Sequence, residues 1–272
     1  MTWRRGVAAG VVLLGLANMA SEALAEGGEV EGTHEGVVWT VSPIAGVDRN
    51  RLKVRGPDGS VTAETDTGPE YGVFALMARP SLVINNFLFY SDVNKADVWG
   101  NLFYANFYGS SRREVTWNLG GGYLYHEIRP EDVRITVTDP MVKAGLRLKL
   151  PKWHLSLNPY LGYAWERVEV EIDTPMGTQD VDSDNDSWLY GLTLGYRWRM
   201  LEGGVNYYYQ DSQDLDEDFQ VVRARLNFFF TRKWGIGARI DYAEHQTADD
   251  FSVLVGPVWV SSREAGPKPR VP

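Results

Sequence analysis

The stretch Trp188-Leu-Tyr-Gly-Leu-Thr-Leu-Gly-Tyr-Arg-Trp-Arg-Met200 decides the fold, because small or polar residues alternate in it with large apolar ones. The small or polar positions are Gly191, Thr193, Gly195, Arg197 and Arg199. The apolar positions are Trp188, Tyr190, Leu192, Leu194, Tyr196, Trp198 and Met200. A period of two predicts a β-strand with one apolar face. Aromatic residues at both ends of that face, with leucines between them, are typical of a strand that contacts lipid and ends at two headgroup layers.

The composition of the whole chain is compatible with such strands. The chain has 272 residues, a net charge of −9 and no cysteine. A mean hydropathy of −0.29 argues against a bundle of membrane helices, whereas alternating barrel strands keep the average low. The absence of cysteine excludes disulfide and thiolate–metal frameworks. The acidic balance argues against nucleic acid as a partner, because nucleic acid binding needs a basic surface.

The N-terminus reads as a secretory signal over residues 1–25. Arg4 and Arg5 precede an apolar run, and Ala23-Leu24-Ala25 predicts cleavage after Ala25. A retained N-terminal anchor is the alternative. Beyond the signal we expect a flexible periplasmic lead-in over 26–36, a barrel over 37–262 and a C-terminal tail over 263–272.

Alternation and turn residues predict about twelve strands, an even number as in single-chain bacterial barrels. The expected strands are 37–47, 71–78, 82–90, 98–108, 115–126, 134–150, 154–171, 188–200, 204–210, 219–230, 234–244 and 251–260. The shorter connections are 79–81, 109–113, 151–152, 201–203 and 231–233. The longer polar connections are 56–69, 91–97, 127–133, 173–186, 211–218 and 244–250. Short periplasmic turns and long extracellular loops would place both termini of the mature chain in the periplasm.

Three of the expected hairpins can be tested for register. With turns at 151–152, 201–202 and 231–233, apolar residues fall opposite apolar ones and charged residues fall together on the other face. The expected pairs are Leu148–Leu155, Trp198–Val205, Phe228–Ile236, Arg225–Arg239 and Arg223–Asp241. A slip of one residue would scatter both sets.

Over residues 37–262 this pattern resembles bacterial outer-membrane β-barrels in general. The resemblance implies an all-β, single closed antiparallel up-and-down transmembrane barrel, located in the outer membrane with lipid around it. One feature departs from the type. Such chains commonly end on an aromatic strand signal, but here Trp259 is followed by the tail that begins at Arg263.

In such a barrel the polar faces of the later strands would line a water-filled lumen. The residues expected there are Lys143, Arg147, Lys149, Arg197, Arg199, Arg223, Arg225, Arg239 and Asp241. Glu166 is the second acidic residue expected on that side, so the lumen would be mainly positive. Tracks of Lys and Arg select anions in pores, and about twelve strands leave room for a narrow bore. The alternative is that these arginines only stabilise the barrel.

The expected outer loops are acidic, most sharply at Asp180, Asp182, Asp184 and Asp186. Alternating aspartates can bind Ca²⁺ through oxygen ligands. The spacing does not fit an EF-hand, because Asn185 and Gly191 stand where that motif needs Gly and Glu. A looser Ca²⁺ site or a solvated acidic loop remains. A non-conducting barrel whose outer loops bind cations, lipopolysaccharide through cations, or a partner is therefore the alternative function.

An enzyme is not expected, and no cofactor is expected apart from that Ca²⁺. His126 and His245 would lie near the outer rim with Asp241 below, which would suit a rim hydrolase. The chain has neither a Gly-x-Ser-x-Gly elbow nor a His-Glu-x-x-His motif, so no nucleophile or metal accompanies the two histidines. The Gly120-Gly-Gly122 run precedes no helix and is expected instead to let a bulky side chain approach a strand closely.

Overall fold

The computed structural model describes residues 37–55, 61–79, 81–93, 96–109, 113–130, 133–174, 177–213, 218–244 and 248–261. The expected signal peptide, the lead-in and the C-terminal tail lie outside these residues. The only helical segment among them is a single 3₁₀ turn, Pro151–Trp153, and no helix in this part is long and apolar enough to cross a membrane.

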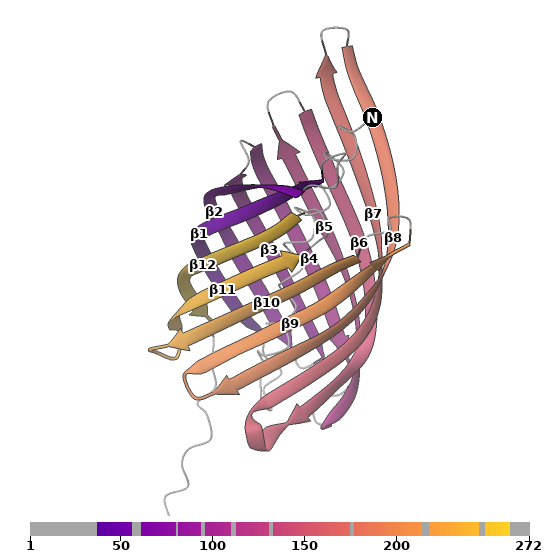
Figure 1. The fold of residues 1–272 in the computed structure, drawn as a ribbon. Coiled ribbons are helices and arrows are strands. Elements are labelled where there is room, and N and C mark those ends of the chain that lie inside the picture. Colours follow the sequence, from indigo (N-terminus) through magenta and orange to yellow (C-terminus); the bar gives the residue numbers. More distant parts are fainter. Residues whose placement is uncertain are drawn as a thin grey trace, which may run out of the picture.

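The described residues form one closed antiparallel barrel of twelve strands (Figure 1). The strands are β1 Val38–Arg55, β2 Val61–Arg79, β3 Leu82–Val93, β4 Ala96–Tyr108, β5 Val115–Arg129, β6 Val133–Leu150, β7 Leu155–Thr174, β8 Gly177–Trp198, β9 Leu201–Ser212, β10 Asp218–Phe229, β11 Trp234–Glu244 and β12 Ala248–Val260. Each strand pairs with its neighbours in the chain, and β1 pairs with β12 to close the sheet. Closure leaves no strand edge unpaired, which is what a sheet needs inside a bilayer. The expected fold class and strand number are confirmed.

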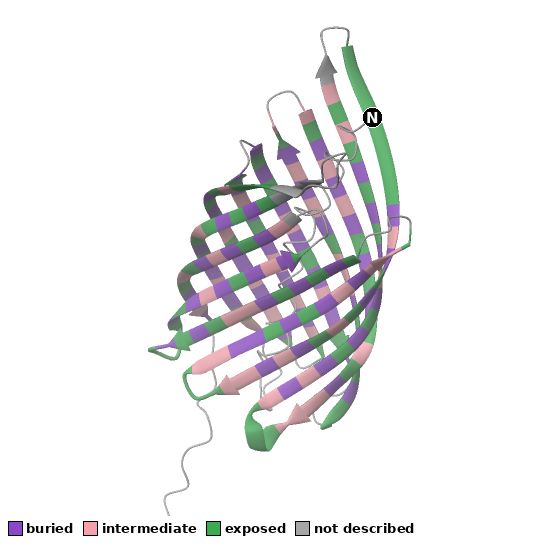
Figure 2. Ribbon diagram, in the orientation of Figure 1, coloured by how far each residue is buried: buried purple, intermediate pink, exposed green. Residues whose placement is uncertain are grey.

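The two faces of the barrel wall follow the alternation of the sequence (Figure 2). In β8, Thr193 points inward and is 1% exposed, whereas its neighbour Leu192 points outward and is 44% exposed. Trp198 at the end of β8 and Trp188 near the middle of this long strand are exposed on the same outward face. An exposed belt of large apolar side chains matches a hydrocarbon environment.

One of the three tested hairpin registers is confirmed. In β10–β11, Phe228 pairs with Ile236 and Arg223 with Asp241, as expected. The register of β6–β7 was wrong, because the chain needs the 3₁₀ turn and a left-handed residue, His154, to reverse direction. As a result Leu148 pairs with Leu157.

The register of β8–β9 was wrong too. The turn lies at Arg199 and Met200, where Arg199 has a φ of 52°, so Trp198 pairs with Leu201 rather than Val205. In both hairpins the shift is by an even number of residues. Side chains therefore stay on their predicted faces, because inward and outward positions repeat every two residues.

Several expected loops are strands instead. β2 begins at Val61, inside the expected loop 56–69, and β8 begins at Gly177, inside the expected loop 173–186. The β7–β8 hairpin projects beyond the neighbouring strands at one end of the barrel (Figure 1). Its tip is exposed on both faces, from Gly177 to Asp184. A polar stretch was read as a loop here because a two-stranded ribbon in water has no apolar face to mark it.

Candidate functional site

The barrel interior receives most of the charged residues that the sequence assigned to it. Lys143, Arg147, Arg223, Arg239 and Asp241 are buried there. Lys149 and Arg225 hold inward positions on β6 and β10 and are partly buried. All seven stand on strands whose inward positions alternate as the sequence predicted.

The other two arginines lie at the end of the barrel where β8 turns into β9. Arg197 is partly exposed, and its Nε lies 3.9 Å from Glu202 Oε2. Arg199 was wrongly placed in the lumen: it belongs to the exposed turn, and its guanidinium lies 4.6 Å from the centre of the Trp198 ring. A left-handed turn residue interrupts the alternation, so the period of two stops before Arg199.

The expectation that lumen acids are few was wrong. Besides Glu166 and Asp241, four carboxylates are buried on the inward face: Asp48, Glu70, Asp139 and Asp250. Asp48 accepts a hydrogen bond from Ser91 Oγ at 2.9 Å and is also hydrogen-bonded to Asp250. Asp250 lies in the expected loop 244–250, and Glu70 lies between the expected loop 56–69 and the expected strand 71–78, so the inward direction of both was not predicted. Asp139 shares the inward period of Lys143 and could have been found.

Much of the interior is apolar, which the sequence did not lead us to expect. The fully buried residues include Phe87, Val98, Leu102, Leu124, Val137, Phe219, Val221 and Leu254. They belong to one continuous cluster of buried apolar side chains that spreads over most of the strands. The lumen therefore combines buried charges with a largely apolar wall.

The buried cations lie against aromatic rings. Lys143 Nζ is 4.8 Å from the ring centre of Tyr104 and 4.3 Å from that of Tyr160. The Arg147 guanidinium lies 4.8 Å from the ring centre of Tyr108. Such distances allow cation–π attraction, which strengthens where water is excluded. The rings thus compensate part of the cost of burying these charges.

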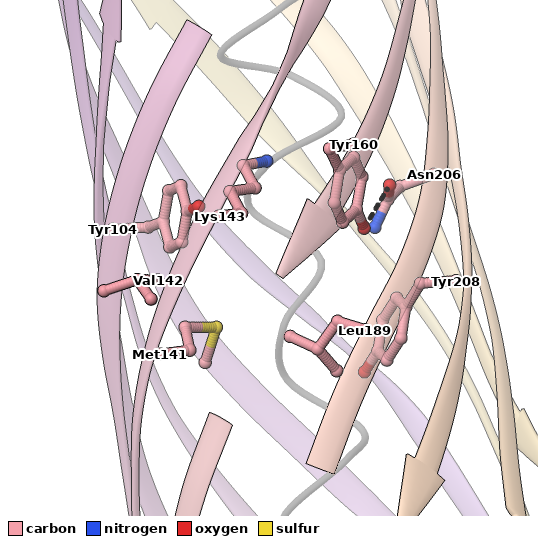
Figure 3. Close-up of a pocket in the computed structure, with 8 residues that line it drawn as sticks. All are labelled: Tyr104, Met141, Val142, Lys143, Tyr160, Leu189, Asn206 and Tyr208. Carbon is pink, nitrogen blue, oxygen red and sulfur yellow. Dashed lines mark hydrogen bonds between the residues drawn. The ribbon is translucent and has the colours of Figure 1, made fainter. Parts of the chain in front are cut away.

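A small pocket lies beside Lys143 (Figure 3). It is lined by Tyr104, Met141, Val142, Lys143, Tyr160, Leu189, Asn206 and Tyr208. Tyr160 donates a hydrogen bond to Asn206 Oδ1 at 3.2 Å, which ties β7 to β9. The pocket volume is about 10 Å³, roughly what one water molecule needs.

The glycine run of β5 explains how Tyr104 fits. A Cβ at Gly120 or Gly122 would overlap the Tyr104 side chain, whereas a Cβ at Gly121 would meet only a carbonyl oxygen, at 3.6 Å. The expected close approach of a bulky side chain to this run is confirmed.

Four inward residues form a group that spans the lumen, which we call the arginine–phenylalanine quartet: Arg225, Arg239, Phe74 and Phe87. Arg225 on β10 lies 4.5 Å from the ring centre of Phe74 on β2, and Arg239 on β11 lies 4.1 Å from that of Phe87 on β3. The two arginines are register partners, and so are the two phenylalanines. The quartet thus joins two walls of the barrel that are not adjacent in the sheet.

The aspartates proposed for Ca²⁺ lie on the projecting β7–β8 hairpin. Asp180, Asp182, Asp184 and Asp186 occupy alternate positions of β8, on the outward face. Asp186 accepts a hydrogen bond from Tyr163 Oη at 3.0 Å, and Asp182 lies 3.4 Å from Arg167 Nη2. Within the described ranges, no group of three or more His, Asp or Glu side chains is arranged to hold a metal ion. A straight strand spaces these carboxylates apart instead of directing them to one point.

Of the two histidines expected near the outer rim, only His126 belongs to the described residues. His126 lies near one end of β5, as expected, but its side chain is fully buried instead of lying on the surface, and its ring meets that of Phe89 edge-on with the ring centres 5.1 Å apart. His245 lies outside the described residues.

Comparison of the fold with solved structures gives matches to outer-membrane barrels. The translocator domain of the autotransporter NalP from Neisseria meningitidis is 12% identical, with 95% of this chain and 96% of that chain covered and a TM-score of 0.55. The transport unit of the autotransporter AIDA-I from Escherichia coli is 9% identical, with 94% and 97% covered and a TM-score of 0.47. The KdgM porin is 9% identical, with 79% and 98% covered and a TM-score of 0.42.

No protein-family model and no curated protein sequence matches the chain. At these identities the structural likeness concerns the fold. The chain has the architecture of a bacterial outer-membrane β-barrel, and this architecture supports a location in the outer membrane.

Proposed function

We propose that the barrel is a narrow pore that favours small anionic solutes. The observation that carries this proposal is the arginine–phenylalanine quartet. Because side chains from non-adjacent strands meet there, we take the quartet as the constriction of the proposed bore. Selectivity of a pore is set at its constriction, and the charges at this constriction are the guanidinium groups of Arg225 and Arg239.

The wider lumen does not oppose this proposal. Its buried carboxylates and cations are similar in number. Near the quartet, Asp241 is paired with Arg239, and Glu70 is within electrostatic reach of Arg239. The three cations Arg223, Arg225 and Arg239 thus outnumber these two carboxylates, so an anion at the constriction would meet an excess of positive charge.

The test is conductance of the purified barrel in a planar lipid bilayer under a KCl gradient. We expect a small conductance and a reversal potential whose sign indicates selectivity for chloride over potassium. The double substitution Arg225→Gln/Arg239→Gln should move the reversal potential toward zero or toward the value for potassium selectivity. Arg199→Gln is the control, because Arg199 lies on an exposed turn. Absence of current, or a reversal potential that the double substitution leaves unchanged, would contradict the proposal.

The projecting β7–β8 hairpin supports a second candidate, a barrel whose outer surface binds divalent cations or lipopolysaccharide through them. Its outward face carries Glu169 and Glu171 on β7 opposite Asp182 and Asp180 on β8. Replacing Asp180, Asp182 and Asp184 by Asn should abolish Ca²⁺-dependent retention on immobilised lipopolysaccharide while the barrel still folds. Retention that does not change on this substitution would remove the candidate.

A further inference from the structure

We infer that the arginine–phenylalanine quartet is a binding site for a small aromatic carboxylate, such as benzoate. The inference deepens the proposed pore by naming the class of solute, and it rests on that proposal only for how the solute reaches the site. Three features of the quartet support it: the hydrogen-bonding capacity of its arginines, their charge, and the rings opposite them.

Each of the two arginines donates a hydrogen bond through its Nε, whereas other nitrogens of its guanidinium have no hydrogen-bond acceptor in the described part of the chain. Arg239 Nε donates to Asp241 Oδ2 at 2.6 Å, and Arg225 Nε donates to Asn227 Oδ1 at 2.9 Å. Nη1 and Nη2 of Arg239 and Nη2 of Arg225 are buried and have no acceptor among the described residues. Buried donors are normally satisfied, and a planar carboxylate matches the forked geometry of a guanidinium.

The charge at the quartet also favours an anion. Arg225 and Arg239 face each other directly in the register, so two like charges lie side by side in a buried place. Asp241 forms an ion pair with Arg239, but it is also the register partner of Arg223, which is a third buried cation. Glu70 is a further carboxylate within electrostatic reach of Arg239, and it is hydrogen-bonded to Ser252. A carboxylate bound between the two arginines would reduce the repulsion between them.

The opposite half of the quartet offers a flat aromatic surface. Phe74 and Phe87 are buried, and Phe87 stacks on Phe89 with ring centres 5.5 Å apart and planes 16° from parallel. The ring of a ligand that enters between the two walls would stack on the phenylalanines and replace their cation–π contacts with the arginines. The carboxylate of the ligand would then pair with the two guanidinium groups. An aliphatic acid such as acetate would satisfy the arginines and leave the phenyl surface unused.

The test is isothermal titration of the folded barrel in detergent with sodium benzoate and, separately, with sodium acetate. We expect benzoate to bind about tenfold more tightly than acetate, the gain of one ring-stacking contact. Arg225→Gln should weaken benzoate binding about tenfold or more, because a charge-assisted hydrogen bond is lost. Phe87→Leu should leave acetate binding unchanged and reduce the preference for benzoate. Arg199→Gln is the matched control, since this arginine also lies over an aromatic ring but outside the lumen.

Equal affinity for benzoate and acetate in the unaltered protein overturns the inference, as does benzoate binding that Arg225→Gln leaves intact. A heat-dependent shift of mobility in gels identifies variants that fail to fold. The comparison of benzoate with acetate in the unaltered protein tests the inference without any variant. The two proposals fail separately. Benzoate binding without current would support the binding site and contradict the pore. Anion-selective current without a preference for benzoate would support the pore and contradict the binding site.

Discussion

The guanidinium of Arg239 lies 4.1 Å from the centre of the Phe87 ring, although β12, β1 and β2 separate their strands around the barrel. The contact crosses the interior. Together with the neighbouring contact of Arg225 with Phe74, it brings two walls of the sheet into touch. A twelve-stranded barrel has room for a bore, and in this chain the side chains decide how much of that bore is left.

Removing the two rings of the quartet should widen the constriction. In Phe74→Ala/Phe87→Ala we expect a larger single-channel conductance in KCl, because no other side chain of the quartet can fill the space of two phenyl groups. Each substitution should also lower the free energy of unfolding, by about 3–5 kcal/mol if neighbours do not collapse into the cavity. Phe228→Ala is the control, since Phe228 is an outward residue of β10. An unchanged conductance in the double variant would mean that the constriction lies elsewhere.

Adding one methyl group beneath Tyr104 should destabilise the barrel. In Gly122→Ala the new Cβ overlaps the tyrosine ring, so the ring or the strand must shift at a cost of about 1–3 kcal/mol. In Gly121→Ala, one residue away, the new Cβ makes an ordinary contact, and stability should change little. Urea unfolding followed by gel mobility measures both variants. Equal effects at the two positions would show that Tyr104 does not rest on this glycine run.

A charge on the outward face should oppose insertion into lipid. Ala224 lies on the outward face of β10 about halfway along the strand, and Ala224→Arg should make folding into vesicles less favourable by about 2–4 kcal/mol if it lies near the bilayer midplane. Gln220→Arg, on the same face near the outer end of β10, should cost about 0–1 kcal/mol. Urea titration of folding into phosphatidylcholine vesicles compares the two. A similar cost at both positions would contradict a membrane-spanning β10.

Breaking the buried ion pair of Arg239 should be costly. In Asp241→Asn the Arg239 guanidinium stays buried but loses its carboxylate partner. We therefore expect the free energy of unfolding to fall by about 3–5 kcal/mol. The double variant Asp241→Asn/Arg239→Gln should recover part of this loss, because the unpaired charge is then gone. The control is Glu169→Gln, which breaks the exposed 3.0 Å pair with Arg167 and should change stability little. Additive effects in the double variant would mean that the pair is not coupled.

The sequence predicted the parts of this protein that depend on neighbours along a strand. The alternation in 188–200 indicated which side of β8 meets lipid, and the same period placed Lys143, Arg223 and Arg239 inside. These assignments survived two wrong registers because both errors were even. Where the period was interrupted or the polarity was uniform, prediction failed, as at Arg199 in its turn and along the hairpin that carries Asp180.

Only the tertiary structure decided which inward residues meet. A period of two indicated that Arg239 points inward, but the strand that carries Phe87 alternates poorly, and the sequence says nothing about which side chain lies opposite another across the lumen. That relation depends on the number of strands, on the stagger between them and on closure through β1 and β12. The arginine–phenylalanine quartet therefore exists only in the closed barrel, where residues far apart in the chain come within reach of one another.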